Sequence, residues 1–371
     1  MKRKLAVFLF LGLSLLLFLL FPAESGRAKV RLDKVGLANR HFVPREPYDW
    51  RGAKTHALIT DIWYPAGRSA VEQPQFVGNA ATPFALAGDA ASNAPILEKP
   101  ATFPLILLSH GTGGSSQIMA WFGAGLAAHG YIVAAVNHPG NNSLEAYTPE
   151  GFALWWERAT DLSAVLDQML ADATFGPHID PKRIGAAGFS LGGFTVLEIA
   201  GGIGELPRLL EYCKTHASDT MCSDPPEFPG LSKKIEALMN ADPAVQSAIL
   251  DGAHSHRDPR VRAIFAMAPA IGPAFSTDSL ATITIPAQIL AGSADIIALP
   301  TSNARFFAAH IRGAQLTILQ DVGHYTFLDT CAALGRTSRP NLCLDNAGVL
   351  RDDIHAQTVN LAVQFFDTNL R

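Results

Sequence analysis

Short apolar runs alternate with amphipathic segments along the chain from about residue 103. The runs have the length and composition of buried strands, and the segments between them repeat apolar residues at helical spacing. Parallel strands need a long crossover, usually a helix, so this alternation predicts the α/β class: a mostly parallel sheet with helices on both faces. We expect strands at 104–109, 131–136, 183–189, 261–267, 287–291 and 316–319, an earlier antiparallel strand at 57–64, and helices at 118–129 and 155–170.

Two stretches interrupt this alternation. Residues 74–100 are rich in Ala, Pro and Asn, and we expect a loop there. Residues 201–259 form a long insertion with a helical patch near 233–239, and long loops on an α/β sheet often lie over the site as a lid. The expected organisation is one domain over 26–371 that carries a lid-like segment at about 201–259.

The N-terminus has the pattern of a secretory signal. Basic residues at 2–4 precede an uncharged apolar run over 5–21, and the small residues Ala23 and Ser25 suit a cleavage site. We therefore expect a signal peptide at 1–25 and export to the periplasm or the cell exterior. The alternative is an uncleaved anchor, because the run is at the short end of the ~17–25 residues that span a bilayer. Only such an anchor would bring the protein into contact with a membrane.

The charge balance and the cysteines narrow the partners and the chemistry. The chain carries 29 Lys and Arg against 33 Asp and Glu without a basic stripe, so we expect no nucleic-acid partner. In an oxidising compartment Cys213 would pair with Cys222 and Cys331 with Cys343. The alternative is four unpaired cysteines. Neither spacing is C-x-x-C, which argues against zinc or redox chemistry.

The segment 188–193 reads Gly-Phe-Ser-Leu-Gly-Gly and contains the pattern G-x-S-x-G. It follows a predicted strand and precedes a helix, which is the context in which this pattern forms a sharp turn with an exposed serine. Glycines at 188 and 192 remove Cβ atoms that would collide with the neighbouring strand and helix. We therefore predict that Ser190 is a nucleophile and that the backbone N–H of Leu191 binds an oxyanion.

A serine nucleophile needs a base, and His324 is the histidine whose position fits. It follows the last predicted strand in a loop with Gly323 beside it, and the histidine of this architecture comes last in chain order. Four other histidines follow Ser190 before residue 331, and they are disfavoured because three lie in the insertion and the last lies in a helix-like segment: His216, His254, His256 and His310.

The acid that orients the base is expected in the loop after the preceding strand. Asp295 follows the strand at 287–291 and is the predicted acid. Asp321 is the nearest rival, but it lies just before His324 in the chain and suits a loop-capping role better. Asp278 is disfavoured because it precedes the strand.

A second oxyanion donor is expected in the glycine-rich stretch 109–114. This stretch reads Ser-His-Gly-Thr-Gly-Gly, and we assign the backbone N–H of Thr112 to the role. A phosphate-binding loop is excluded because the chain has no G-x-x-x-x-G-K-[ST] pattern. The pattern G-x-G-x-x-A at 123–128 lies inside a helix-like segment, so we interpret it as close packing.

Metal and cofactor chemistry are not expected. Residues 254–258 contain ligand-type side chains, but H-E-x-x-H is absent from the chain, and we predict no metal site and no cofactor. Trp121, Trp155 and Trp156 either line an apolar pocket or pack in the core, and core packing is the favoured interpretation.

These segments together resemble the α/β-hydrolase superfamily, and more narrowly the dienelactone hydrolase-like and platelet-activating factor acetylhydrolase-like serine esterases. The stretches D-x-W-Y-P-A at 61–66 and S-H-G-T-G-G at 109–114 carry the narrower resemblance, which extends through 133–140 to His324. It implies the α/β-hydrolase fold and hydrolysis of esters or lactones by the predicted serine, acid and base, without a cofactor. Dienelactone hydrolases proper use a cysteine nucleophile, whereas this chain has Ser190, and the acetylhydrolases act on short acyl groups of phospholipids.

The expected function is two-step acyl transfer on a small-molecule or lipid ester. The base takes the serine proton as the hydroxyl attacks the carbonyl, and water then releases the acyl group. Two alternatives stay open: a peptidase or amidase of the same fold, and a non-catalytic, envelope-tethered binding protein that retains the fold.

Overall fold

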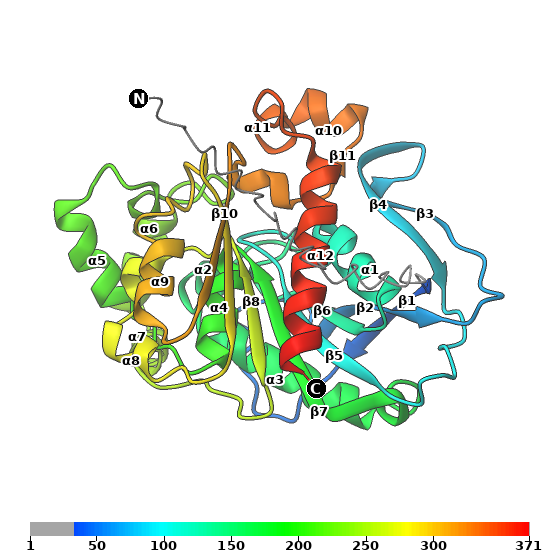
Figure 1. Cartoon of the computed structure of the whole chain (residues 1–371). Coiled ribbons are helices and arrows are strands. Elements are labelled where there is room, and N and C mark those ends of the chain that lie inside the picture. The colour runs from blue at the N-terminus through cyan, green and yellow to red at the C-terminus, as the bar shows by residue number, and fades with distance from the viewer. Residues whose placement is uncertain (1–32, 371) are drawn as a thin grey trace, which may run out of the picture. The chain divides into compact units, whose positions relative to one another are not determined.

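The computed structural model describes residues 33–370, and the predicted signal peptide at 1–25 lies outside them. The described residues contain a sheet of eleven strands in the order β10-β9-β8-β7-β5-β6-β2-β1-β4-β11, with β3 paired to β4 (Figure 1). The strands are β1 (Lys34–Phe42), β2 (Leu58–Ala66), β3 (Gln73–Asn79), β4 (Thr82–Ser92), β5 (Phe103–Ser109), β6 (Ile132–Val136), β7 (Ile179–Phe189), β8 (Ala263–Met267), β9 (Ala287–Gly292), β10 (Gln315–Leu319) and β11 (Thr330–Cys331).

Most neighbouring strands in the centre of the sheet run parallel. β5 pairs in parallel with β6 and β7, and β8, β9 and β10 continue the parallel run. β2 is antiparallel to both β6 and β1, as expected for the strand predicted at 57–64. The prediction of a mostly parallel α/β sheet is confirmed, and each predicted strand has a counterpart in the structure.

Helices lie between and after these strands. They are α1 (Ala120–Ala128), α2 (Pro149–Ala153), α3 (Glu157–Ala171), α4 (Leu191–Ile199), α5 (Leu206–Thr215), α6 (Leu231–Ala241), α7 (Pro243–Asp251), α8 (Thr277–Ala281), α9 (Ala304–His310), α10 (Ala333–Ser338), α11 (Pro340–Cys343) and α12 (Arg351–Asn369). The helices predicted at 118–129 and 155–170 correspond to α1 and α3.

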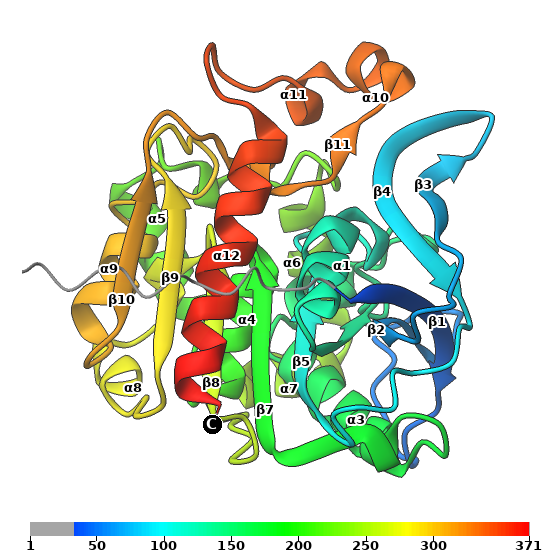
Figure 2. The same cartoon turned by 45° about the vertical axis from the view of Figure 1, so that its right-hand side comes forward.

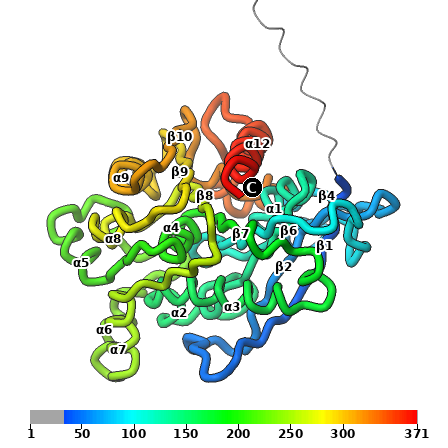
Figure 3. Tube along the Cα trace, turned by 60° about the horizontal axis from the view of Figure 1, so that its bottom comes forward, coloured from blue at the N-terminus to red at the C-terminus, as the bar shows by residue number. Residues whose placement is uncertain are grey.

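The strands alternate their side chains between two apolar cores, and helices cover each core. Leu105 and Leu107 of β5 belong to one core with residues of α3 and α4, whereas Ile106 and Leu108 belong to the other with residues of α1 and α12. Figure 3 shows α1 and α12 on one side of the strands and α3 and α4 on the other, and Figure 2 shows α12 crossing in front of the sheet.

Close packing explains the glycines of α1. A Cβ at Gly123 would lie 2.5 Å from the ring of Trp63, and one at Gly125 would lie 2.6 Å from a methyl group of Val359 on α12. These glycines therefore let α1 approach both the sheet and α12, as the pattern at 123–128 predicts.

The three tryptophans singled out in the sequence pack in or against the core, as predicted. Trp155 and Trp156 are buried in the core on the α3 side. Trp121 is half-buried and stacks on His355 of α12, with ring centroids 3.9 Å apart.

The prediction of a loop at 74–100 is wrong, because β3 and β4 form a β-hairpin in this region. β3 pairs with β4, and β4 also pairs with β1 and β11. β3 lies at the edge of the sheet, where all its residues are exposed or half-buried and where Pro74 is tolerated. An edge strand of this kind needs no apolar alternation, so its residues have the composition of a loop.

The insertion at 201–259 is mainly helical. It contains α5, α6 and α7, and α6 covers the helical patch predicted near 233–239. A disulfide joins Cys213 to Cys222 inside the insertion, and a second joins Cys331 to Cys343. Both suspected pairings are therefore present. Within residues 33–370, no helix has the length and apolar character that crossing a membrane requires.

Candidate active site

Ser190 lies between β7 and α4 on a turn with a strained backbone. Its φ of 57° and ψ of −116° are unusual for a residue with a side chain, and a serine at a sharp strand-to-helix turn adopts such strain. Neighbouring backbone holds the turn, because the N–H of Ser190 donates to the carbonyl of Met267 at 2.9 Å and the carbonyl of Ser190 accepts from the N–H of Ala270 at 3.2 Å.

The two predicted glycines permit this turn. A Cβ at Gly188 would collide with the backbone of Gly192, and a Cβ at Gly192 would collide with the carbonyl group of Ser109 at the end of β5. The start of α4 therefore packs directly on the ends of β5 and β7, which places Ser190 beside the stretch 109–114.

His324 and Asp295 form a continuous hydrogen-bond chain with Ser190. Nε2 of His324 lies 2.9 Å from Oγ of Ser190, and Nδ1 of His324 lies 2.7 Å from Oδ2 of Asp295. A carboxylate only accepts hydrogen bonds, so the imidazole donates from Nδ1 and accepts from the serine hydroxyl at Nε2. The three residues selected from the sequence thus lie together, with 7% of Ser190, 4% of His324 and 2% of Asp295 exposed.

The loop after β9 holds Asp295 in this orientation. The second carboxylate oxygen, Oδ1, accepts from the backbone N–H groups of Ile297 at 2.9 Å and Ala298 at 2.8 Å. Both oxygens are therefore engaged, and the carboxylate is fixed relative to the imidazole of His324.

The rival residues make local contacts instead. Asp321 accepts from the side chain of Gln320 at 3.0 Å, and Asp278 lies in the first turn of α8. The disfavoured histidines are placed as follows: His216 stacks on Tyr212, His254 bonds to Asp251, His256 is half-buried, and His310 bonds to the carbonyl of Phe306.

The two backbone N–H groups proposed to bind the oxyanion, those of Thr112 and Leu191, have no hydrogen-bond acceptor within residues 33–370. The stretch 109–114 lies against the serine, since a Cβ at Gly111 would be 3.3 Å from Cβ of Ser190. This arrangement leaves both donors free for a ligand atom beside Ser190.

A second Ser–His–Asp arrangement is fully buried and begins at Ser109, the first residue of the stretch 109–114. Oγ of Ser109 is 2.8 Å from Nε2 of His138, and Nδ1 of His138 is 2.7 Å from Oδ2 of Asp161 on α3. Arg51 donates to both oxygens of Asp161, and Arg158 donates to Ser109 and to the carbonyl oxygen of His110. Because Ser109 and His138 have no exposed surface, this arrangement is a buried polar network and not an accessible site.

Charge in this buried network is set by burial and by its arginines. Burial, with Arg158 nearby, lowers the pKa of His138 to about 3, so its imidazole is neutral at physiological pH. Burial alone would raise the pKa of Asp161, but Arg51 and His138 hold it below its ordinary value. The sequence analysis missed these residues; the only local signal was Asn-His-Pro-Gly after the strand at 131–136.

The insertion reaches the site through Glu227 and Phe228. A Cβ at Gly113 would lie 3.1 Å from Cγ of Glu227, and Phe228 packs edge-on against Phe152 with ring centroids 5.1 Å apart. Tyr147, which neighbours both, donates to the carbonyl of Gly113 at 2.8 Å. This part of the insertion therefore covers the far end of the stretch 109–114.

Glu227 also brings a carboxyl group close to the base. Burial raises the pKa of Glu227 above its ordinary value, and the electrostatic interaction with His324 opposes that rise. Burial and the charge of Glu227 raise the pKa of Tyr325 to about 12. The surroundings of His324 thus include one partly buried acid from the insertion, which the sequence analysis did not identify.

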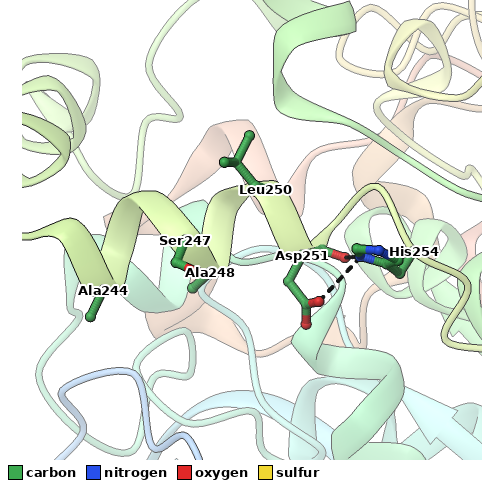
Figure 4. Close-up of a pocket in the computed structure, with 6 residues that line it drawn as sticks. All are labelled: Ala244, Ser247, Ala248, Leu250, Asp251 and His254. Carbon is green, nitrogen blue, oxygen red and sulfur yellow. Dashed lines mark hydrogen bonds and ion pairs between the residues drawn. The ribbon is translucent and has the colours of Figure 1, made fainter.

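A separate pocket lies on the surface of the insertion, away from these residues. Figure 4 shows it lined by Ala244, Ser247, Ala248, Leu250, Asp251 and His254. Of the six residues that line it, Asp251 and His254 have titratable side chains, and these lie 3.2 Å apart. Within residues 33–370, no three metal-ligating side chains come together.

Comparison with protein families gives one match in the N-terminal half of the fold. The family model of platelet-activating factor acetylhydrolase, isoform II, matches residues 61–151. This segment runs from β2 to α2 and contains the stretch 109–114.

Curated relatives match over similarly short segments. The chain is 42% identical over 80 residues to Lipase 1 of Moraxella sp. (strain TA144), which is 22% of each chain. It is 35% identical over 101 residues to cutinase est1 of Thermobifida alba, 27% of this chain and 31% of the cutinase. The chain therefore spans less than a third of the length of either relative.

Among solved structures, the chain is similar over nearly its whole length to a ferulic acid esterase from Streptomyces cinnamoneus. The TM-score is 0.59 and the sequence identity 21%, and the match covers 93% of this chain and 92% of the esterase. The two proteins share their fold.

Proposed function

We propose that the chain, which has the fold of the α/β-hydrolases, is a serine hydrolase that cleaves carboxylic esters. The observation that carries the proposal is the hydrogen-bond chain from Ser190 through His324 to Asp295 on a strained strand-to-helix turn. The local similarity to a lipase, a cutinase and an acetylhydrolase family supports an ester as the substrate.

The proposed reaction proceeds through an acyl-enzyme. Nε2 of His324 takes the proton of Ser190 as Oγ attacks the ester carbonyl, and the resulting imidazolium returns that proton to the leaving alcohol. Asp295 holds the imidazole tautomer and stabilises its charge. Water then attacks the acyl group with the same proton transfers and regenerates the serine.

The N–H groups of Thr112 and Leu191 are the proposed oxyanion donors. Their freedom from partners and the contact between Gly111 and Ser190 support this assignment. One such donor contributes roughly 3–4 kcal/mol to stabilising the transition state in comparable sites.

The insertion at 201–259 is the proposed lid. Its residues Glu227 and Phe228 lie over the end of the stretch 109–114 and restrict the space there. We also propose that the protein acts outside the cytoplasm, because two disulfides persist in oxidising compartments and the N-terminal sequence has the pattern of a secretory signal.

A panel of p-nitrophenyl esters from acetate to palmitate, run beside aminoacyl p-nitroanilides, tests the substrate class. We expect turnover of one or more esters and little turnover of the anilides. Faster anilide cleavage would identify a peptidase or amidase. Absence of turnover together with absence of labelling by a fluorophosphonate would identify a non-catalytic binding protein.

A further inference from the structure

The direction of the Thr112 N–H depends on the peptide bond that joins Gly111 to Thr112. The carbonyl of Gly111 and the N–H of Thr112 belong to the same planar unit and point in opposite directions. Whatever holds the carbonyl oxygen of Gly111 therefore also aims the N–H of Thr112.

Two donors hold this carbonyl oxygen. Nδ1 of His110 lies 2.6 Å from it, and the backbone N–H of Gly114 donates to it at 3.2 Å. The N–H at the other end of the peptide unit, on Thr112, has no partner within residues 33–370. The unit is thus anchored on the side away from the proposed oxyanion.

The tautomer of His110 is determined by its two contacts. The carbonyl of Gly111 only accepts, so Nδ1 of His110 carries the proton, and Nε2 accepts from the backbone N–H of His138 at 3.2 Å. His110 is 1% exposed. Burial, followed by the charge of Arg158, holds the pKa of His110 well below the ordinary value, which keeps this neutral form at physiological pH.

The buried network fixes His110 itself. Arg158 donates to the carbonyl oxygen of His110, and the backbone of His138 donates to its ring, while the side chain of His138 is bonded to Ser109 and Asp161. A charged guanidinium therefore holds the backbone, and a backbone donor holds the ring.

We propose that His110 is a positioning residue that turns the N–H of Thr112 toward the oxyanion, with the network around Asp161 as its support. This inference rests on the proposed function, since it assigns a role within the same site. In this proposal the buried arrangement of Ser109, His138 and Asp161 does not react with substrate. Its role is to help orient the peptide unit whose N–H contacts the reacting oxygen.

Two substitutions separate this role from a general contribution to folding. His110→Asn keeps an N–H donor at the position of Nδ1, whereas His110→Leu keeps a similar volume and removes the donor. Loss of an oxyanion donor lowers kcat by about 10²–10³-fold in comparable enzymes. His110→Leu keeps the N–H of Thr112 but no longer fixes its direction, so we expect a smaller effect, a fall in kcat of at least about tenfold. KM should change less than about threefold, and His110→Asn should recover most of the lost kcat.

Inhibition by a boronic acid gives a second readout. The tetrahedral adduct on Ser190 carries a negative oxygen in the oxyanion site, so its Ki should rise with His110→Leu in proportion to the fall in kcat. Thermal unfolding confirms that each variant is folded. A folded His110→Leu with kcat within threefold of the wild type, or an Asn variant as impaired as the Leu variant, would overturn the proposal.

A crystal structure of His110→Leu separates this proposal from the proposed function. If wild type and Ser190→Ala both fail to hydrolyse esters, the proposed function is wrong, and the orientation of the Gly111–Thr112 peptide still decides the role of His110. A rotated peptide supports the positioning role, and an unchanged peptide contradicts it.

Discussion

The hydroxyl group of Thr220 donates a hydrogen bond of 2.5 Å to the carbonyl oxygen of Ile297. Thr220 lies inside the loop that the Cys213–Cys222 disulfide closes, and the N–H of Ile297 donates to the carboxylate of Asp295. The insertion is therefore connected directly to the loop that holds the proposed acid.

Removing this disulfide tests the connection. Replacing Cys213 and Cys222 together by Ser should lower the free energy of unfolding by about 2–3 kcal/mol, because the unfolded chain regains the entropy of a short open loop. Denaturant unfolding measures this loss. We also expect kcat to fall, since the Asp295 loop loses its support. Thr220→Val, which keeps the disulfide and removes only the hydroxyl, should lower kcat in the same direction; unchanged kcat in both variants would contradict the connection.

Truncating Phe228 should change the choice of acyl chain. Its ring packs on Phe152 beside Gly113, so Phe228→Ala opens space at the end of the stretch 109–114. We expect kcat/KM for p-nitrophenyl octanoate relative to acetate to rise at least about tenfold, the scale of discrimination by a small volume change in an apolar pocket. Leu250→Ala, an exposed change in the same insertion, is the control. Equal ratios in both variants would show that Phe228 does not limit the pocket.

Glu198 on α4 gives a pH dependence of stability. It is fully buried, one oxygen accepts from Gly204 at 2.8 Å, and the other has no partner among residues 33–370. Burial raises its pKa well above the ordinary value. The folded protein therefore keeps a proton that the unfolded chain releases above about pH 4.3, so this group reduces stability as pH rises from there toward the raised pKa.

Replacement by an uncharged isostere removes that dependence. Glu198→Gln keeps the oxygen that accepts from Gly204 and cannot ionise. The melting temperature of the variant minus that of the wild type should therefore be larger at pH 8 than at pH 5. Differential scanning calorimetry at the two pH values gives the comparison. If the difference in melting temperature between variant and wild type is the same at both, Glu198 is ionised in the fold.

Local sequence was sufficient for the central sheet and for the serine turn. Buried parallel strands are continuous apolar runs, and Gly188 and Gly192 are required by backbone contacts that any such turn makes. The order of the predicted strands was then enough to select Asp295 and His324, because the loops that follow parallel strands lie at the same edge of the sheet as Ser190.

Other features depend on distant contacts and leave little local signal. In the hairpin, β3 has only exposed or half-buried residues and contains Pro74, so its pairing with β4, and not its composition, distinguishes it from a loop. Asp161 lies on an ordinary amphipathic helix, and its bond to His138 appears only when α3 packs on β6. The approach of Glu227 to Gly113 likewise depends on the path of the whole insertion.

The assignment of the acid is tested by a pair of substitutions. Asp295→Asn should lower kcat by about 10⁴-fold, because the amide favours the wrong imidazole tautomer. Asp321→Asn should leave kcat near that of the wild type, since within residues 33–370 the side-chain carboxylate of Asp321 accepts only from its neighbour Gln320, and its bonds to Ser293 and Asn346 are made by the backbone. Ester hydrolysis measured for both variants decides the matter, and the reverse pattern would identify Asp321 as the acid.

Labelling by a fluorophosphonate, followed by mass spectrometry of the modified peptide, tests the central claim most directly. We expect wild type to be labelled at Ser190 and Ser190→Ala to be unlabelled, with hydrolysis of p-nitrophenyl acetate reduced roughly 10⁶-fold. The buried Ser109 should remain unlabelled in both proteins. Labelling or turnover that survives in Ser190→Ala at the wild-type level would contradict the assignment of Ser190 as the nucleophile.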